Sequence, residues 1–380
     1  MKKIRFLTIL AAAFFVITLL SLSTCKTKEA KEVKIGIVAP ITGEAAAFGI
    51  SAKKGAILYF DAINESGGID GMMIKYIVED DRGDPAEGAN AYSKLIGQDK
   101  VSVICGTVMS KVSLAGALIA QGKGVPMVSP TSTNPAVTLV GDYIFRACFI
   151  DPFQGFVAAR YAIDTVGAGT AAALYDAGND YTRGLAGVFR AEFPKLGGKI
   201  VAFESYATGT TDFNPQLVKI KKVNPDVLFL PNYYNDSGLI ARQAREMGIT
   251  AQLLGSDGWD SPDLIKIAGD SINGGVFVNH FTTGSDLPAA QKFVRDYEAE
   301  FGQKPNAMGA LAYEAAMIIV EAIKNAGSTD SRAIRDALAA TNMETITGTI
   351  RYDENRNPVK GAVILEIKDG KIFYLTSINP

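Results

Sequence analysis

The sequence predicts an α/β protein with two doubly wound lobes, each a parallel sheet covered by helices on both faces, joined by several hinge strands. Three observations support this fold class. Short apolar segments rich in β-branched residues alternate with longer segments of helical periodicity along most of the chain. This alternation occurs in two series of similar size, on either side of residue 149. The length of 380 residues also suits two domains.

The first series runs to residue 133. Its predicted strands are 33–39, 73–79, 101–105 and 126–129, and its predicted helices are 51–64, 84–97 and 112–121. Ala56, Ile57 and Phe60 follow a helical spacing in the first helix, and Gly67-Gly68 ends it. The second helix begins at Asp84-Pro85, an N-cap residue followed by a proline at the first helical position.

An extended segment, 143–150, leads into the second series. Its predicted helices are 151–166, 182–193, 213–222 and 239–247, and its predicted strands are 171–175, 199–206, 227–230, 252–255 and 275–278. Three more helices follow at 288–301, 307–325 and 331–340. The last segments, 348–352, 362–368 and 371–375, are predicted to be antiparallel, because Asp369-Gly370 is a hairpin turn.

The chain is expected to cross between the lobes more than once, and such crossings act as hinges. We expect residues 33–148 and 281–346 to form the first lobe. Residues 149–280 and 347–380 are expected to form the second.

The first 32 residues are predicted to be a leader and a tether. Lys2, Lys3 and Arg5 precede an apolar stretch that reaches Leu22, which is typical of a signal peptide. The end of this stretch, Leu22-Ser23-Thr24-Cys25, resembles a bacterial lipobox, in which the cysteine is lipidated and becomes the mature N-terminus. We therefore expect a lipoprotein signal peptide over residues 1–24 and a charged tether over residues 25–32, outside the cytoplasmic membrane. Ordinary secretion and an uncleaved anchor are the alternatives.

Two further cysteines, Cys105 and Cys148, lie in apolar, strand-like surroundings. We expect them to be buried free thiols. A disulfide between them is the alternative, since an oxidising compartment would permit one.

Composition and missing motifs exclude several classes of function. Lys and Arg number 38 against 40 acidic residues, so there is no cationic excess for binding nucleic acid. The chain has one histidine, His280, so it cannot build a His-rich zinc site, and no metal or cofactor is expected. The segment 167–172 matches the dinucleotide pattern G-x-G-x-x-A, but it precedes a strand instead of following one. P-loop, H-E-x-x-H and G-x-S-x-G motifs are absent, so we predict that the protein is not an enzyme.

Hydroxyl-bearing residues follow two neighbouring predicted strands. Ser110 comes after the strand 101–105, and Thr131-Ser132-Thr133 comes after the strand 126–129. Ligands of open parallel sheets bind outside the carboxyl ends of the strands, so we expect these residues to form half of a small-molecule site. Ser110 could also cap the helix that follows it, and residues 131–133 could serve only as a turn.

The order of motifs resembles that of the branched-chain amino-acid (Leu/Ile/Val) binding family of ABC transporters, which are type I periplasmic binding proteins. The resemblance covers roughly residues 34–260 and rests on the stretches IGIVAPITGEAAAFG, DAINESGGIDG, VEDDRGDP, ICGTVMS, SPTSTNP, DYIFRACFIDPFQG, DYTRGLA, TDFNPQLVKIKKVNPDVLFLPNY and LLGSDGW. The tail GTIRYDENRNPVKGAVILEIKDGKIFYL is similar to the family's ending. The resemblance implies two Rossmann-like lobes that close on a ligand as a Venus flytrap.

The resemblance also implies a role for each matching residue. Ser110 would bind the ligand carboxylate, and residues 131–133 would add further donors. Asp257 would pair with the ligand ammonium group, although it could be only a turn residue. Tyr181 and Tyr233 would close over the ligand from the second lobe.

Two aromatic residues are expected near the ligand side chain. Phe48, in the predicted first loop, would line the side-chain pocket. Trp259 would do the same, with core or rim packing as the alternative. His280 is expected to be structural, near a crossing between the lobes.

The family implies an extracytoplasmic receptor that captures an amino acid, branched-chain or otherwise apolar, and delivers it to an ABC permease with cytoplasmic ATPases. We expect a monomer tethered to the membrane by lipid, with no nucleic-acid partner. The alternative is a binder or sensor of the same fold for an amide, urea, or an aromatic or carboxylic acid. Asp257 separates the two hypotheses, because a ligand without an amine would leave it buried and unpaired.

Overall fold

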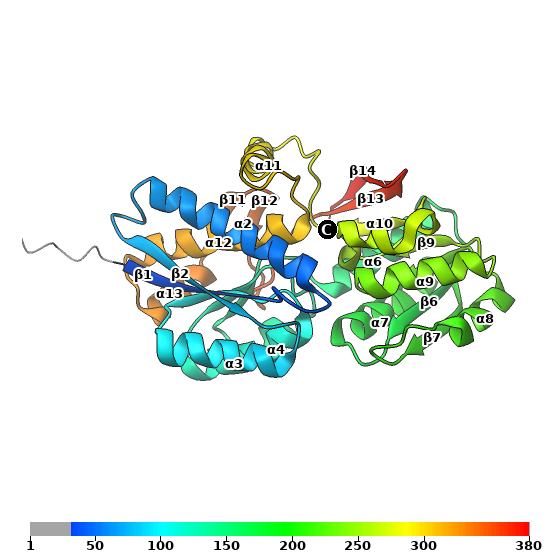
Figure 1. The fold of residues 1–380 in the computed structure, drawn as a ribbon, viewed down its shortest axis with the longest axis horizontal. Helices are drawn as coiled ribbons and strands as arrows, with labels where there is room; N and C mark the ends of the chain where they lie inside the picture. Colours follow the sequence, from blue (N-terminus) through cyan, green and yellow to red (C-terminus); the bar gives the residue numbers. More distant parts are fainter. Residues whose placement is uncertain (1–31, 380) are drawn as a thin grey trace, which may run out of the picture.

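The computed structural model describes residues 32–379, which form two lobes lying side by side (Figure 1). The predicted signal peptide, Cys25 and most of the tether lie outside the described residues. Each lobe contains one sheet with helices on both faces, so the predicted fold class is confirmed. No helix within residues 32–379 is long and apolar enough to span a bilayer.

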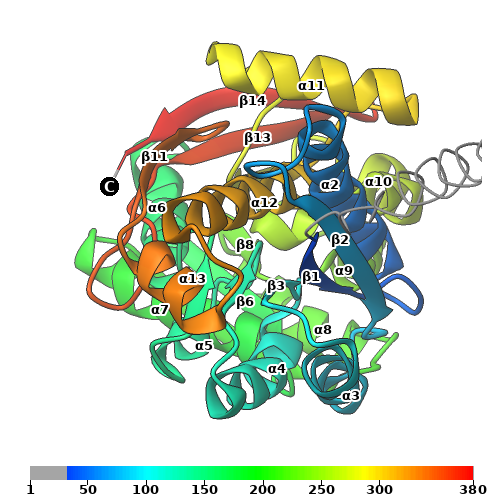
Figure 2. The same ribbon diagram turned by 90° about the vertical axis from the view of Figure 1, so that its left-hand side faces the viewer.

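The first sheet has five parallel strands in the order β2-β1-β3-β4-β5. They are β1 (Glu32–Ala39), β2 (Met73–Asp80), β3 (Val103–Gly106), β4 (Met127–Ser129) and β5 (Ile144–Arg146). Two helices, α2 (Ala46–Glu65) and α12 (Ala307–Ala326), cover one face, and α3 (Pro85–Lys94) and α4 (Ser110–Lys123) cover the other (Figure 2). All four residues of β3 are buried, as expected for a strand covered on both faces.

Smaller elements complete this lobe. They are the π-helical turn η1 (Leu95–Asp99), the short helix α5 (Ala136–Leu139), and the helices α11 (Pro288–Phe301) and α13 (Ser331–Ala339). α13 packs against α12, so two late helices cover a sheet formed by the first part of the chain.

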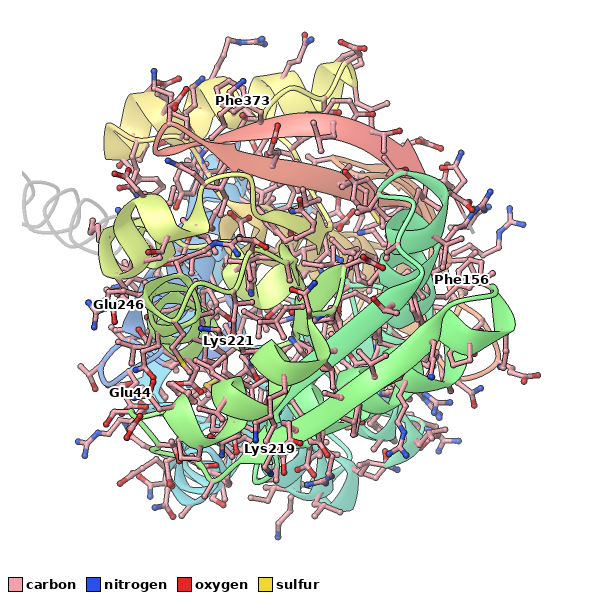
Figure 3. All side chains as sticks on the ribbon, turned by 90° about the vertical axis from the view of Figure 1, so that its right-hand side faces the viewer. Glu44, Phe156, Lys219, Lys221, Glu246 and Phe373 are labelled. Carbon is pink, nitrogen blue, oxygen red and sulfur yellow. The ribbon has the colours of Figure 1, made fainter. Side chains whose placement is uncertain are left out.

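The second sheet has seven strands in the order β14-β13-β10-β9-β8-β6-β7. The five parallel strands are β6 (Thr170–Asp176), β7 (Lys199–Tyr206), β8 (Val227–Leu230), β9 (Gln252–Gly255) and β10 (Val276–Asn279). β13 (Ala362–Lys368) and β14 (Lys371–Ile378) are antiparallel, as predicted from the turn Asp369-Gly370. β14 forms an outer edge of the sheet, where Phe373 is exposed (Figure 3).

Helices cover both faces of this sheet. α6 (Asp151–Asp164) packs with α7 (Asp180–Lys195), while α9 (Tyr234–Glu246) packs with α8 (Asn214–Val223) and α10 (Pro262–Ala268). Two single 3-10 turns, η2 (Asp257–Trp259) and η3 (Gly269–Ile272), flank α10.

Three segments cross between the lobes: 147–150, 280–287 and 352–361. A buried ion pair, 2.7 Å from Lys360 Nζ to Glu314 Oε2, ties the third crossing to α12. The same ammonium group donates to the carbonyl of Ala147 in the first crossing, at 3.0 Å. A hairpin of β11 (Asn342–Thr345) and β12 (Gly348–Arg351) precedes the third crossing. The predicted lobe boundary at residues 346/347 falls in the turn of this hairpin, and the assignment of residues to lobes stays a prediction.

Two helices begin five residues earlier than predicted. α2 begins at Ala46 and α9 at Tyr234, and neither is preceded by a residue whose side chain caps it. The predicted loop position of Phe48 is therefore wrong, because Phe48 lies in the first turn of α2. α10 was not predicted, although Ser261 caps it by accepting a hydrogen bond from the Asp263 amide, with Pro262 at its first position.

Cys105 and Cys148 are buried free thiols, as predicted. Burial raises the pKa of each thiol to about 12. Both are therefore protonated and unreactive at neutral pH.

Candidate functional site

A small cavity lies between the two lobes, beyond the carboxyl ends of β3, β4 and β9. Its empty volume is ≈ 260 Å³. The residues that line it are Phe48, Val108, Ser110, Thr131, Thr133, Tyr181, Tyr233, Asp257, Gly258 and Met308. Seven of the nine predicted ligand contacts are in this set, and Ser132 and Trp259 are not. The cavity is therefore the candidate ligand site.

The first-lobe wall carries hydroxyl groups and the start of α4. Ser110 is the first residue of that helix and does not cap it, because the cap residue is Met109. The Ser110 hydroxyl accepts only a long contact, 3.4 Å, from the Asn134 amide. The Thr133 hydroxyl is buried without a hydrogen-bond partner among the described residues. Unpaired hydroxyls beside a helix N-terminus can donate to an anion.

The other two predicted hydroxyls are used within the protein. Thr131 donates to the Val108 carbonyl at 3.0 Å, although it also lines the cavity. Ser132 lies behind the wall, 2.7 Å from the Ser113 hydroxyl, and also contacts the Val108 carbonyl at 3.1 Å. Ser132 therefore stabilises the loop and does not face the cavity.

A buried cation supports the same loop from behind. Arg146, at the end of β5, is fully buried. Its guanidinium group donates to the carbonyls of Ser132 and Asn134, the latter at 2.8 Å, and to the Thr138 hydroxyl at 3.2 Å. This fixes the loop that carries the hydroxyls and places a positive charge behind the first wall.

The second-lobe wall carries Asp257, which follows β9. One oxygen of this buried carboxylate accepts hydrogen bonds from Gln154 Nε2 at 2.8 Å and from the Tyr181 hydroxyl at 2.5 Å. The other oxygen lies 3.1 Å from His280 Nε2. Burial acts to raise the pKa of Asp257, but these hydrogen bonds and His280 outweigh burial and lower it. The carboxylate is therefore charged at neutral pH and can hold a cation.

Aromatic rings close the cavity. Tyr181 and Tyr233 stack with ring centroids 5.2 Å apart and an interplanar angle of 10°. Phe48 meets Tyr233 edge-on at 5.9 Å, and Tyr234 at 4.8 Å. Because Phe48 belongs to the first lobe and the tyrosines to the second, this cluster forms only when the lobes meet.

The expected ligand contact of Trp259 is not supported by its position. The indole is fully buried in the second lobe, donates to the Leu230 carbonyl at 3.0 Å and lies 6.1 Å from Phe277. Gly255 and Gly275 leave room for the ring. The alternative of core packing thus describes Trp259.

Three residues near Asp257 were not predicted as site residues. Asp151 and Gln154 lie three positions apart at the start of α6, so they share a helix face. His280 follows β10, the neighbour of β9, so the rule that identified Ser110 would also have placed His280 beside Asp257. These signals were available in the sequence.

Asp151 is a buried carboxyl group beside the Thr133 hydroxyl. Neither of its oxygens has a hydrogen bond among the described residues, although the Thr133 hydroxyl is close by. Burial raises the pKa of Asp151 to about 7, and the charge of Asp257 acts in the same direction. A second acid near the site can therefore take up a proton near neutral pH.

Direct contacts join the lobes around the cavity. Asn134 Nδ2 donates to the Asp180 carbonyl at 3.0 Å. The Glu44 carbonyl accepts from the Tyr234 hydroxyl at 2.6 Å and from Asn235 Nδ2 at 2.8 Å, and Glu44 is labelled beside the second lobe in Figure 3. The structure is thus a closed form.

Within residues 32–379, no group of three or more His, Cys, Asp or Glu side chains could hold a metal ion.

Comparisons with known proteins agree with this architecture. The family model described as "Periplasmic binding protein" matches residues 32–371. A Leu/Ile/Val-binding protein homolog 3 of Brucella melitensis is 33% identical over 348 residues, which cover 90% of this chain and 94% of that protein.

Two crystal structures share the fold. The leucine binding protein LivK of Thermotoga maritima has a TM-score of 0.88 and 37% identity, and it covers 92% of this chain and 99% of that one. LivJ of Streptococcus pneumoniae, a branched-chain amino acid transporter substrate binding protein in complex with isoleucine, has a TM-score of 0.88 and 34% identity, with 92% and 100% covered. These matches confirm the predicted resemblance and favour a binding protein over an enzyme. The chain belongs to the periplasmic binding protein family, alongside the Leu/Ile/Val-binding proteins.

Proposed function

We propose that this protein is an extracytoplasmic receptor that captures an amino acid between its lobes and delivers it to an ABC permease with cytoplasmic ATPases. The observation that carries the proposal is the contrast between the two cavity walls. Free hydroxyls and the start of α4 face the cavity from one side, and the charged Asp257 faces it from the other. A zwitterion, with its carboxylate and its ammonium group on one carbon, complements both walls.

The remaining lining favours an apolar ligand side chain. Phe48, Val108 and Met308 are hydrophobic and line the cavity beside the polar groups. The relatives named as Leu/Ile/Val-binding and the relative crystallised with isoleucine support a branched-chain or other apolar amino acid.

The proposed mechanism is lobe closure. The ligand carboxylate first binds Ser110 and the loop 131–133 of the open first lobe. Closure then brings Tyr181, Tyr233 and Asp257 over the ligand. Because closure excludes water, the charged contacts become stronger than they would be in an open cleft.

The alternative is a receptor of the same fold for an amide, urea, or an aromatic or carboxylic acid. Calorimetry on protein that has been unfolded and refolded to remove bound ligand separates the two. We would titrate Leu, Ile, Val, Phe, Ala and Glu, with amine-free 2-keto acid and amide controls. A dissociation constant on the order of micromolar or tighter for an apolar amino acid, with the keto acid rejected, supports the proposal. Binding of only the amide or the acid would contradict it.

The remaining proposals concern attachment and assembly. We propose that residues 1–24 are removed and that lipid on Cys25 anchors a monomer to the membrane through the tether 25–32. Mass spectrometry of the native protein should find a diacylated Cys25 at the N-terminus. A mature chain that begins elsewhere would contradict the lipid anchor.

A further inference from the structure

His280 connects the ligand site to the hinge. It is the first residue of the crossing segment 280–287, and its ring stacks on Phe149 of the crossing segment 147–150, with centroids 3.6 Å apart and an interplanar angle of 28°. The Nε2 atom of the same ring lies 3.1 Å from Asp257 Oδ2. The side chain is fully buried. One ring therefore contacts two crossing segments and the acid that we assign to the ligand ammonium group.

The hydrogen-bond partner fixes the tautomer of this ring. The Asp257 carboxylate can only accept, so Nε2 must carry the hydrogen, and Nδ1 of the neutral ring is left as an acceptor. Nδ1 is buried and has no partner among the described residues. It is the one ring atom that remains able to take up a proton.

A second cavity lies on the hinge side of His280. Its empty volume is ≈ 850 Å³, and its wall includes His280, Asp286, Thr347, Ser377 and Asn379. The wall combines the second crossing with the turn of the β11–β12 hairpin and with β14. His280 lines this cavity and does not line the ligand cavity, although its side chain is fully buried.

The groups around His280 have opposing effects on its pKa. Burial lowers its pKa and is the largest effect, while the neighbouring Asp257 carboxylate raises it. Lys360 lowers the pKa and Glu314 raises it, and these two form their own ion pair. Asp286 is in the wall of the hinge cavity. The net shift is downward, so the ring is neutral at pH 7.

We propose that His280 is a positioning residue that holds Asp257 toward the ligand ammonium group, and that a proton taken up at Nδ1 from the hinge side weakens amino-acid binding in acid. The proposal rests on the proposed function. A neutral ring donates to Asp257 without cancelling its charge. An imidazolium would neutralise the carboxylate and would repel the ammonium group, so proton uptake and ligand binding oppose each other.

The sole histidine makes the first test direct. Nitrogen-15 NMR of histidine-labelled protein, produced without a histidine tag, reports His280 alone. We expect the Nε2–H tautomer at about pH 7.5 and a downward shift of its titration midpoint when an amino acid is added. The Nδ1–H tautomer, or an upward shift with ligand, would overturn the proposal. The ligand-free spectrum tests the tautomer even if no amino acid binds, a result that would instead contradict the proposed function and the ligand part of this inference.

Matched variants supply the second test, by calorimetry from about pH 5 to 8. His280→Gln keeps a donor near the Nε2 position but cannot titrate, whereas His280→Asn loses that donor. Wild-type affinity should fall by up to about tenfold per pH unit below the His280 midpoint. His280→Gln should bind as wild type does near neutral pH and lose this acidic decline, and His280→Asn should bind roughly tenfold more weakly at neutral pH.

Asp151→Asn is the control, because Asp151 is a second buried titratable group near the site and burial raises its pKa to about 7. The acidic decline should persist in Asp151→Asn. Its persistence in His280→Gln, or its loss in Asp151→Asn alone, would overturn the proposal. Equal losses in His280→Gln and His280→Asn at neutral pH would indicate a purely structural role and would also overturn it.

Discussion

The two walls of the ligand cavity differ in charge: the first wall is neutral, with a buried cation behind it, and the second wall is negative. The first wall presents neutral hydroxyls and backbone donors, and the buried Arg146 holds the loop that carries them. The second wall presents the Asp257 carboxylate, whose hydrogen bonds from the protein are already made. Each wall suits one end of a zwitterion, and neither wall alone suits both ends. The proposed selectivity for a zwitterion therefore requires closure of the two lobes.

Removal of the negative charge from the second wall should have the largest effect on amino-acid affinity. Asp257→Asn keeps the shape of the side chain but leaves the ligand ammonium group without its counter-charge. We expect amino-acid affinity to fall by roughly 2–5 kcal/mol, by analogy with the breaking of a buried charge pair. Calorimetry measures this loss, and Asp270→Asn, an exposed acid on η3, is the matched control. Unchanged affinity in Asp257→Asn would remove Asp257 from the site.

Removal of Arg146, which supports the first wall from behind, should have the next largest effect, and this effect is on the free energy of unfolding. Arg146→Met leaves the buried Ser132 carbonyl without a donor, whereas the Asn134 carbonyl still accepts from the Val137 amide at 3.2 Å. An unpaired buried group costs about 1–3 kcal/mol, so the free energy of unfolding should fall by a similar amount. Urea denaturation measures this change, and calorimetry should show weaker ligand binding as well. Arg242→Met, on the exposed surface of α9, should change stability by no more than about 0.5 kcal/mol.

Asp151 determines whether the second lobe offers one negative charge or two. Its pKa of about 7 lies above its ordinary value, so its contribution to stability is complete in acid and is lost as the pH rises from about 4 to 7. The asparagine of Asp151→Asn does not titrate, so the variant does not lose this stability as the pH rises. The variant should therefore gain stability relative to wild type by about 1.4 kcal/mol per pH unit between pH 5 and 7. Urea denaturation at several pH values measures the gain, and a constant difference across this range would contradict the raised pKa.

The strands, the layers and most of the site could be predicted from the sequence. Buried parallel strands are marked by local apolar runs, and the rule that ligands bind at their carboxyl ends placed Ser110 and Thr133 at the cavity without any long-range information. The family resemblance was needed to predict ligand contacts for Asp257, Tyr181 and Tyr233. Nothing in their local sequence separates a ligand contact from a turn residue or a surface aromatic residue. Their position at the cavity wall agrees with that expectation.

The parts that could not be predicted depend on long-range packing. The starts of α2 and α9 lack a side-chain cap, so no local signal marks them. Trp259 is next to Gly258 in sequence, yet its ring points into the core, because Gly255 and Gly275 leave space there. Met308 reaches the cavity from α12, far along the chain from the other lining residues, and only the folded lobe brings it there.

The smallest expected effect on amino-acid affinity comes from the removal of single hydroxyl groups of the first wall. It distinguishes a hydroxyl that contacts the ligand from one that supports the loop. Ser110→Ala should weaken amino-acid binding by about 1.5–2 kcal/mol, because one hydrogen bond to a charged carboxylate is lost. Stability should not change, since Ser110 does not cap α4. Ser132→Ala is the matched control, because its hydroxyl bonds to Ser113 and to backbone carbonyls behind the wall. That variant should lose about 1 kcal/mol of stability while its direct contribution to binding stays near zero. If both variants lost affinity equally, the carboxylate would be recognised by the loop as a whole, and the division of the first wall into a contacting and a supporting hydroxyl would be wrong.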